Sequence, residues 1–321
     1  MSAAADIAMS RRRAYGSVAA LVIVACFALA AAAPFWLNGY GLYLLTLTEI
    51  FVLVALGLNL LTGYAGQISL CHAAFFGVGA YATALLTQKA GWPYLVSLGA
   101  GALITTAIGA IVAVPALRLK NLYLAIATLG FGVVLQKIIF EWRGLTGGGG
   151  GLALTPPRIG GAELGATGLY YLTLVLTALG LWVAWNVSRS RTGRALRIIK
   201  ESEIAAASLG IQPARYKVTA FAISAFYAAI AGGLFAYLVR YINPESFNVS
   251  LSIAFLSMVV IGGLGTIGGS IVGATFYVLI PELLRGIKDA PGLVFGLLLV
   301  IVMVFMPQGL WGMARRVVGR R

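Results

Sequence analysis

The chain has 321 residues, of which 60% are hydrophobic and only 10% charged, with a mean hydropathy of +0.96. Soluble domains are about half apolar, so this composition excludes an ordinary water-soluble protein. The net charge of +14 suggests nucleic-acid binding as one hypothesis. The basic residues gather in alternate loops between apolar runs, however, so we expect no nucleic-acid partner. Both cysteines, Cys26 and Cys71, lie inside apolar runs, which indicates no disulfide framework.

Apolar runs of about 20 residues recur along the chain, and a helix needs about that length to cross the hydrocarbon core of a bilayer. The sequence therefore predicts an all-α fold, a polytopic transmembrane bundle of about 8–10 spans in one domain. The third candidate opens with polar residues, and the two around Gly268 also fit one span plus a re-entrant segment. The candidate spans are residues 17–36, 42–61, 68–87, 94–114, 122–140, 168–187, 218–239, 251–268, 269–284 and 292–306.

Basic residues set the predicted orientation of this domain, residues 17–314. They concentrate in the tail 1–16, at Arg118 and Lys120, in the segment 188–216 and in the tail 315–321. Loops rich in Lys and Arg stay on the cytoplasmic side of a membrane, so both termini are predicted to be cytoplasmic.

The first span follows a basic region and ends in three alanines, so a cleaved signal peptide competes with a retained membrane anchor. Its apolar stretch is longer than that of a usual signal peptide. Pro34 would also follow the cleavage point directly, which disfavours cleavage. We therefore expect a retained anchor.

The stretch 63–81, GYAGQISLCHAAFFGVGAY, places Gln67, Ser69 and His72 within apolar sequence. Such interruptions at membrane depth are tolerated only in positions that are buried in protein or lined by water. His72, the only histidine, has no cysteine or carboxylate partners at metal-ligand spacing, so no metal site is expected. A buried hydrogen-bonded role, a place on a transport path and a proton relay all remain open for it. Glu49, inside the second span, is equally open to a structural or a functional role.

Two polar segments separate the spans. The outer one, 141–167, contains TGGGGG and two adjacent prolines, which predicts an irregular surface loop. The inner one, 188–216, is predicted to hold a helix over 192–209 with Gly210 after its last turn. Its exposed side would carry the ion pairs Arg197 with Glu201 and Lys200 with Glu203.

Gly265, Gly269 and Gly273 repeat every four residues. This spacing predicts a smooth helix face for close packing, with a hinge or broken helix beside the substrate path as the alternative.

Motifs of enzymes are missing from the sequence. It contains no GxSxG, no HExxH and no GxxxxGK[ST], since no lysine follows a glycine. We expect no catalytic residues and no cofactor in this chain. If ATP drives the protein, another polypeptide must bind the nucleotide.

Five sequence blocks spread over the chain stand out together. They are LGLNLLTGYAGQISLCHAAFFGVGAY (56–81), TGGGGGLALTPP (146–157), SRTGRALRIIKESEIAAASLGI (190–211), SIAFLSMVVIGGLGTIGGSIVGA (252–274) and FMPQGLWG (305–312). In this order they resemble the permeases of branched-chain amino acid ATP-binding cassette (ABC) importers, specifically the LivM type. One departure is Cys71, where many relatives have glycine before the histidine.

The resemblance implies a permease domain in a bacterial plasma (inner) membrane. Its partners would be a second related permease, two ATP-binding subunits and an extracytoplasmic solute-binding protein. The segment 188–216 then resembles the family's coupling segment, which docks on an ATPase; an amphipathic helix lying on anionic lipid is the alternative. The coupling candidates are Thr192, Gly193, Arg194, Arg197, Glu201, Glu203 and Gly210.

A transport path in such a protein needs a polar lining, for which the candidates are Asn59, Gln67, Ser69 and His72. Branched-chain amino acids are the expected substrates, while relatives also carry other amino acids, amides, urea or aromatic acids. The competing hypothesis is an ion-coupled secondary transporter acting alone. It would need charges inside the membrane, and the sequence offers Glu49, Lys137 and Glu282.

Overall fold

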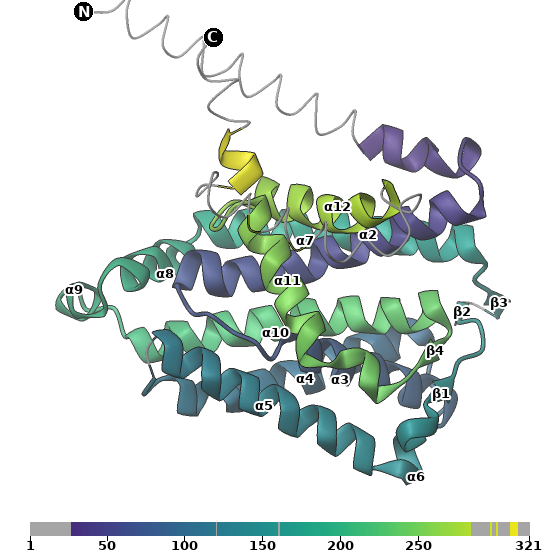
Figure 1. The fold of residues 1–321 in the computed structure, drawn as a ribbon, viewed down its shortest axis with the longest axis horizontal. Coiled ribbons are helices and arrows are strands. Elements are labelled where there is room, and N and C mark those ends of the chain that lie inside the picture. Colours follow the sequence, from purple (N-terminus) through teal and green to yellow (C-terminus); the bar gives the residue numbers. More distant parts are fainter. Residues whose placement is uncertain are drawn as a thin grey trace, which may run out of the picture.

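Long helices run side by side, with the short helices α8 (Arg191–Glu201) and α9 (Glu203–Ser208) at one end of the bundle and short strands at the other (Figure 1). This computed structural model describes residues 27–119, 121–159, 161–283, 296, 300 and 309–313. Outside them lie both predicted tails, Cys26, Lys120, the first half of the predicted first span and most of the span 292–306. Five described helices are long and apolar enough to cross a membrane. They are α2 (Gly39–Leu58, continued by a π-helix, Asn59–Tyr64), α4 (Tyr94–Ala116), α5 (Asn121–Glu141), α7 (Ala166–Arg189) and α10 (Pro213–Val239).

Three shorter helices differ from the predicted spans. The third span begins as a helix only at His72, so α3 covers His72–Gln88 and the backbone over 66–71 is not helical. The pair around Gly268 is a helical hairpin of α11 (Val249–Gly262) and α12 (Ile267–Leu283), which pack on each other. The chain breaks between them because Gly263 and Gly265 adopt positive φ angles of 126° and 73°.

The remaining elements lie at the two ends of the bundle. At one end are α8 (Arg191–Glu201) and α9 (Glu203–Ser208). At the other end β1 pairs with β4 and β2 with β3, both antiparallel, within and beside the predicted outer loop. The elements at that end are α6 (Arg143–Thr146), 3-10 turns at Gly148–Gly150 and Pro244–Phe247, β1 (Leu152–Ala153), β2 (Arg158–Ile159), β3 (Ala162–Glu163) and β4 (Tyr241–Ile242); a further 3-10 turn, Ala33–Phe35, precedes α2.

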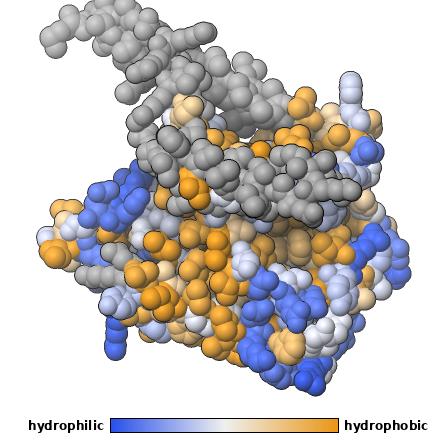
Figure 2. All heavy atoms as spheres, in the orientation of Figure 1, coloured by the Kyte–Doolittle hydropathy of each residue, from blue (hydrophilic) through white to orange (hydrophobic). Residues whose placement is uncertain are grey.

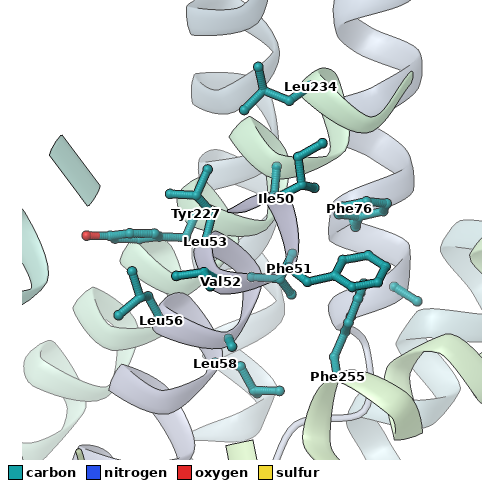
Figure 3. Packing of buried hydrophobic residues seen from close by; sticks show 14 of the residues in the cluster. Ile50, Phe51, Val52, Leu53, Leu56, Leu58, Phe76, Tyr227, Leu234 and Phe255 are labelled. Atoms are coloured by element: carbon teal, nitrogen blue, oxygen red, sulfur yellow. The ribbon is translucent and has the colours of Figure 1, made fainter. Parts of the chain in front are cut away.

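Helix α10 packs against α2, α3 and α4 through small residues. A methyl group at Gly232 would overlap the backbone oxygen of Phe76, and one at Gly79 would overlap the backbone of Ala229. Close backbone approach of this kind holds helices together in lipid. Beside it, the Phe255 ring meets Phe51 and Phe76 edge to face, with centroids 5.7 and 5.4 Å apart (Figure 3).

Apolar side chains cover the middle of the visible surface, while polar residues gather toward its two ends (Figure 2). On the outside of α4, for example, Leu103 and Ile111 are 66% and 68% exposed. A soluble protein would not expose such a continuous apolar surface, whereas lipid solvates it. The chain is a multi-pass α-helical membrane protein.

Candidate functional site

The π-helix at the end of α2 is joined to the start of α12 by one side chain, Asn59. The Asn59 Oδ1 atom accepts a hydrogen bond from the Gly265 N–H at 2.7 Å. Its Nδ2 atom donates to the Thr266 backbone oxygen at 2.7 Å and to Ser270 Oγ at 2.9 Å. The contact leaves no space, because a methyl group at Gly63 would overlap both Asn59 Oδ1 and Gly265 N. Asn59, a path candidate, therefore has its whole amide engaged between helices in this conformation.

The non-helical segment 66–71 and the start of α3 are held by hydroxyl groups from three other helices. Thr128 of α5 accepts from the Leu70 N–H, and Ser252 of α11 accepts from the Ala73 N–H, both at 3.0 Å. The Ser224 hydroxyl of α10 hydrogen bonds to His72. Backbone groups that no helix satisfies at membrane depth need such partners.

His72 is completely buried, and both ring nitrogens are hydrogen bonded. Nδ1 lies 3.1 Å from Ser69 Oγ, and Nε2 lies 2.5 Å from Ser224 Oγ. This is the buried hydrogen-bonded arrangement that the sequence left open for His72. A place on the transport path stays a prediction for both His72 and Ser69.

Gln67 differs from the other path candidates. It is only 3% exposed, and its amide nitrogen and oxygen have no hydrogen-bond partner among the described residues. Its backbone is fixed, because the Gln67 N–H donates to Leu61 O and its carbonyl accepts from Thr62 Oγ1. A buried amide without partners is costly unless another group reaches it.

The inner polar segment forms two helices, so the predicted single helix over 192–209 is wrong. Ser190 caps α8 by accepting from the Gly193 N–H, and Ser202 ends α8 and caps α9 by accepting from the Ala205 N–H. The break arises because Ser202 is extended, with φ −159° and ψ 118°. Gly210, with φ +74°, follows α9 where the sequence predicted a terminating glycine.

Both predicted ion pairs in this segment are also wrong. Arg197 donates to the Ser188 backbone oxygen at 2.5 Å, and its guanidinium lies 5.2 Å from the centre of the Tyr64 ring. Lys200 Nζ donates to the Gly63 backbone oxygen at 3.0 Å. Contacts with the π-helix thus replace pairing along the helix surface, because α8 packs against the bundle.

Glu203 forms its ion pair with Lys217 of α10, at 2.6 Å. The Lys217 side chain is only 6% exposed, so α9 is tied to α10 by a largely buried cation. The outer side of α8 and α9 stays open: Arg194 and Glu201 are exposed, Thr192 is half-buried, and Gly193 is buried against the Val187 and Ser188 carbonyls. Ile204 and Leu209 are 80% and 68% exposed.

The three spaced glycines do not share one helix face. Gly269 and Gly273 lie on α12, where added methyl groups would overlap the backbone oxygens of Gly263 and Met258. Gly265 precedes the helix and forms the turn beside Gly63. The i, i+4, i+8 spacing fails at its first member because the chain turns there.

Comparisons with known proteins bear on this geometry. The profile of a family described as "Branched-chain amino acid transport system / permease component" matches residues 40–307. The chain belongs to this permease family. It is 36% identical over 320 residues to the "high-affinity branched-chain amino acid transport system permease protein LivM" of Escherichia coli, covering 92% of this chain and 75% of that protein.

Two further relatives extend the comparison. LivM of Salmonella typhimurium is 34% identical over 92% of this chain and 75% of its own length. The related permease LivH of Escherichia coli is 25% identical over 83% of this chain and 92% of its own. No solved structure matches the chain. The π-helix, the segment 66–71, α8, α9 and the α11–α12 turn all lie within the family match.

Sequence reasoning missed the residues that connect these elements. Ser224 and Ser252 are small hydroxyl residues in largely apolar helices, and Lys200 and Lys217 appear in the sequence as ordinary surface charges. A polar residue inside an apolar span was the available signal for the two serines. The lysine contacts join residues 137 and 14 positions apart, and no local pattern indicates them.

Proposed function

We propose that this chain is the transmembrane permease subunit of an ABC importer in a bacterial plasma (inner) membrane, with both termini cytoplasmic. It would form half of a translocation pathway with a second related permease, and branched-chain amino acids are its expected substrates. Two ATP-binding subunits and an extracytoplasmic solute-binding protein would complete the complex. The observation that carries the proposal is the family match across residues 40–307.

The geometry of α8 and α9 supports a coupling role for the segment 188–216. Its open face presents exposed apolar side chains, Ile204 and Leu209, beside charged ones, which suits docking on another subunit. Its inner face contacts the π-helix through Lys200 and Arg197. A displacement of α8 by ATP-driven closure of the ATPases would therefore act directly on the end of α2.

From the π-helix the displacement has two routes. Asn59 connects it to the start of α12, and the chain itself continues through Gln67 and Ser69 to α3. These are the places where helices are broken, and broken helices line substrate sites in many transporters. We place the transient polar lining of the path at Gln67, Ser69 and His72, with Asn59 joining it when the α12 contact opens.

The competing secondary transporter is disfavoured by where charges lie. Lys137 is exposed near the end of α5 and pairs with Glu141 at 3.2 Å. Glu282, near the end of α12, accepts a hydrogen bond from Tyr40 at 2.6 Å. Both therefore lie close to helix ends, and Glu49 is the one acidic residue deep within a described long span. A secondary transporter needs charged groups inside the membrane to bind its coupling ion, and a single carboxyl supplies little of such a site.

Reconstitution in liposomes tests the proposal. The chain alone should accumulate no leucine, isoleucine or valine under a proton or sodium gradient. Vesicles that contain the chain, the second permease, both ATPases and the binding protein should accumulate these amino acids. They should do so only when ATP is present on the side of the membrane where the ATPases lie. Gradient-driven accumulation by the chain alone would refute the ABC assignment. Ligand screening on the binding protein separately tests the substrate class.

A further inference from the structure

A cavity of about 660 Å³ is lined by residues of α2, α7 and α12 and of the described chain before α2. The three helices lie together on one side of the bundle (Figure 1). Its walls are almost entirely apolar. Each neighbouring segment contributes to them, for example Leu45 and Val52 of α2, Leu181 of α7, Ile271 of α12, and Phe27 and Trp36. The coupling and path candidates lie elsewhere, so the cavity has no part in the proposed function.

One carboxyl group, that of Glu49, lines this apolar cavity. Its Oε2 atom is buried and has no hydrogen-bond partner among the described residues. Nearby hydroxyls are directed elsewhere: Thr48 donates to the Leu44 backbone oxygen, Tyr170 to that of Ala30, and Thr177 to the backbone oxygen of Glu49 itself. Glu49 is therefore the only residue of the described lining that carries a carboxyl group, and one oxygen of that group lacks a partner among the described residues.

The chemistry of the cavity selects its guest. An isolated carboxylate is costly in apolar surroundings, and a neutral carboxyl without a partner still loses the hydrogen bond it had in water. A hydrocarbon guest would fill the cavity but would leave the carboxyl without a hydrogen-bond partner. An amine removes this cost, because proton transfer from the carboxyl to the nitrogen forms a hydrogen-bonded ion pair with no net charge to bury.

We propose that this cavity is a binding site for a lipophilic amine, whose nitrogen pairs with the Glu49 carboxyl while its apolar body lies against the walls. The aromatic ring of Trp36 at the cavity adds a surface that favours a cation. The guest would enter from the lipid phase, since amines of this kind partition into membranes. A lipid acyl chain occupying the same space is the alternative that the test must separate.

A matched pair of probes makes that separation. N,N-dimethyldodecylamine and its hydrocarbon isostere, in which a CH group replaces the nitrogen, have nearly the same shape. Binding to the purified full-length protein in nanodiscs is measured by native mass spectrometry. We expect the amine to bind at least about tenfold more tightly than the isostere, as the worth of a charge-assisted hydrogen bond indicates. Equal binding of both probes would mean an apolar or lipid pocket only and would overturn the proposal.

Two variants locate the effect. Glu49→Gln keeps the shape of the side chain and should abolish the preference for the amine. Glu163→Gln, which removes an exposed carboxyl in the outer loop, should leave the preference intact. An unchanged preference in Glu49→Gln, or its loss in Glu163→Gln, would contradict the assignment.

A measurement on the unmodified chain covers the case in which Glu49→Gln fails to fold. Dicyclohexylcarbodiimide enters apolar sites and adds to a protonated carboxyl, and the rearranged N-acylurea keeps every atom of both reactants. Peptide mass spectrometry should find this adduct on Glu49. The tertiary amine, which cannot form an amide, should slow the labelling at least about tenfold, and the isostere should not. No labelling of Glu49, or equal protection by both probes, would refute the site.

Discussion

Lys200 of α8 donates a hydrogen bond to the backbone oxygen of Gly63, 137 residues earlier in the chain, at a distance of 3.0 Å. The stem of the same lysine also covers Gly66, whose φ of +69° ends the π-helix region. One side chain therefore connects the proposed ATPase-facing segment with the point where the second span stops being helical.

Replacing Lys200 by methionine keeps most of the apolar stem and removes the donor. We expect uptake by the reconstituted complex to fall about tenfold, as the loss of a charged hydrogen bond of roughly 1.5–3 kcal/mol indicates, while ATP hydrolysis continues. Lys200→Arg should restore part of the uptake. Parallel loss of hydrolysis and uptake in Lys200→Met would instead indicate a failure of assembly.

Arg197→Ala and Glu201→Ala together should uncouple ATP hydrolysis from uptake without affecting membrane insertion. Arg197 contacts the Tyr64 ring and the end of α7, whereas Glu201 is exposed on the docking side. The double variant therefore alters both faces of α8. Hydrolysis and uptake are measured in the same proteoliposomes, and normal uptake would reject the coupling role.

Gly63→Ala should disrupt the joint between the π-helix and α12, because the added methyl group overlaps Gly265 N and Asn59 Oδ1. We expect a lower Tm in detergent and loss of uptake, with a destabilisation of about 1–3 kcal/mol typical of overpacking. Gly99→Ala is the matched control, since nothing lies within 4 Å of the methyl group there. A similar Tm for both variants would show that the joint is loose.

Gln67 and His72 should respond in opposite ways to apolar replacement. Gln67→Leu removes a side-chain amide that has no partner among the described residues, so Tm should be unchanged or higher while uptake falls. His72→Leu removes the partner of the Ser224 hydroxyl and one of the two partners of the Ser69 hydroxyl, so Tm should fall by an amount equivalent to about 1–3 kcal/mol. Full uptake by Gln67→Leu would remove Gln67 from the path.

Breaking the pair between Glu203 and Lys217 should loosen α9. Lys217→Met leaves Glu203 about one-third exposed and unpaired, so we expect a loss of about 1–2 kcal/mol, less than for a fully buried pair. A double-mutant cycle with Glu203→Gln measures the coupling between them. A coupling energy near zero would show that the pair is incidental.

Much of the fold is readable from hydropathy. The five long helices coincide with predicted spans within a few residues at most ends. A run of about twenty apolar residues matches the thickness of the hydrocarbon core, so it predicts a spanning helix directly. The failures cluster where helices break. Residues 68–71 and 263–266 are as apolar or glycine-rich as their neighbours, so hydropathy does not show that they are not helical. Contacts from other helices hold the first break, and the positive φ angles of Gly263 and Gly265 form the second.

The candidate site was predictable only in outline. Local patterns marked the terminating Gly210 and the polar run from Gln67 to His72, since each departs from its surroundings. They gave the wrong partners for Arg197 and Lys200, because ion pairing along an isolated helix competes with contacts that only the packed bundle provides. Charges acquire their partners from tertiary structure.

The hydroxyls that hold the start of α3 have a consequence for biogenesis. Thr128, Ser224 and Ser252 are all synthesised after His72, the last of them 180 residues later. Until α10 and α11 emerge from the ribosome, the His72 ring and the Ala73 N–H lack the Ser224 and Ser252 hydroxyls that bind them in the folded protein. The start of α3 therefore gains its full set of these hydrogen bonds only late in synthesis, after α11 has formed.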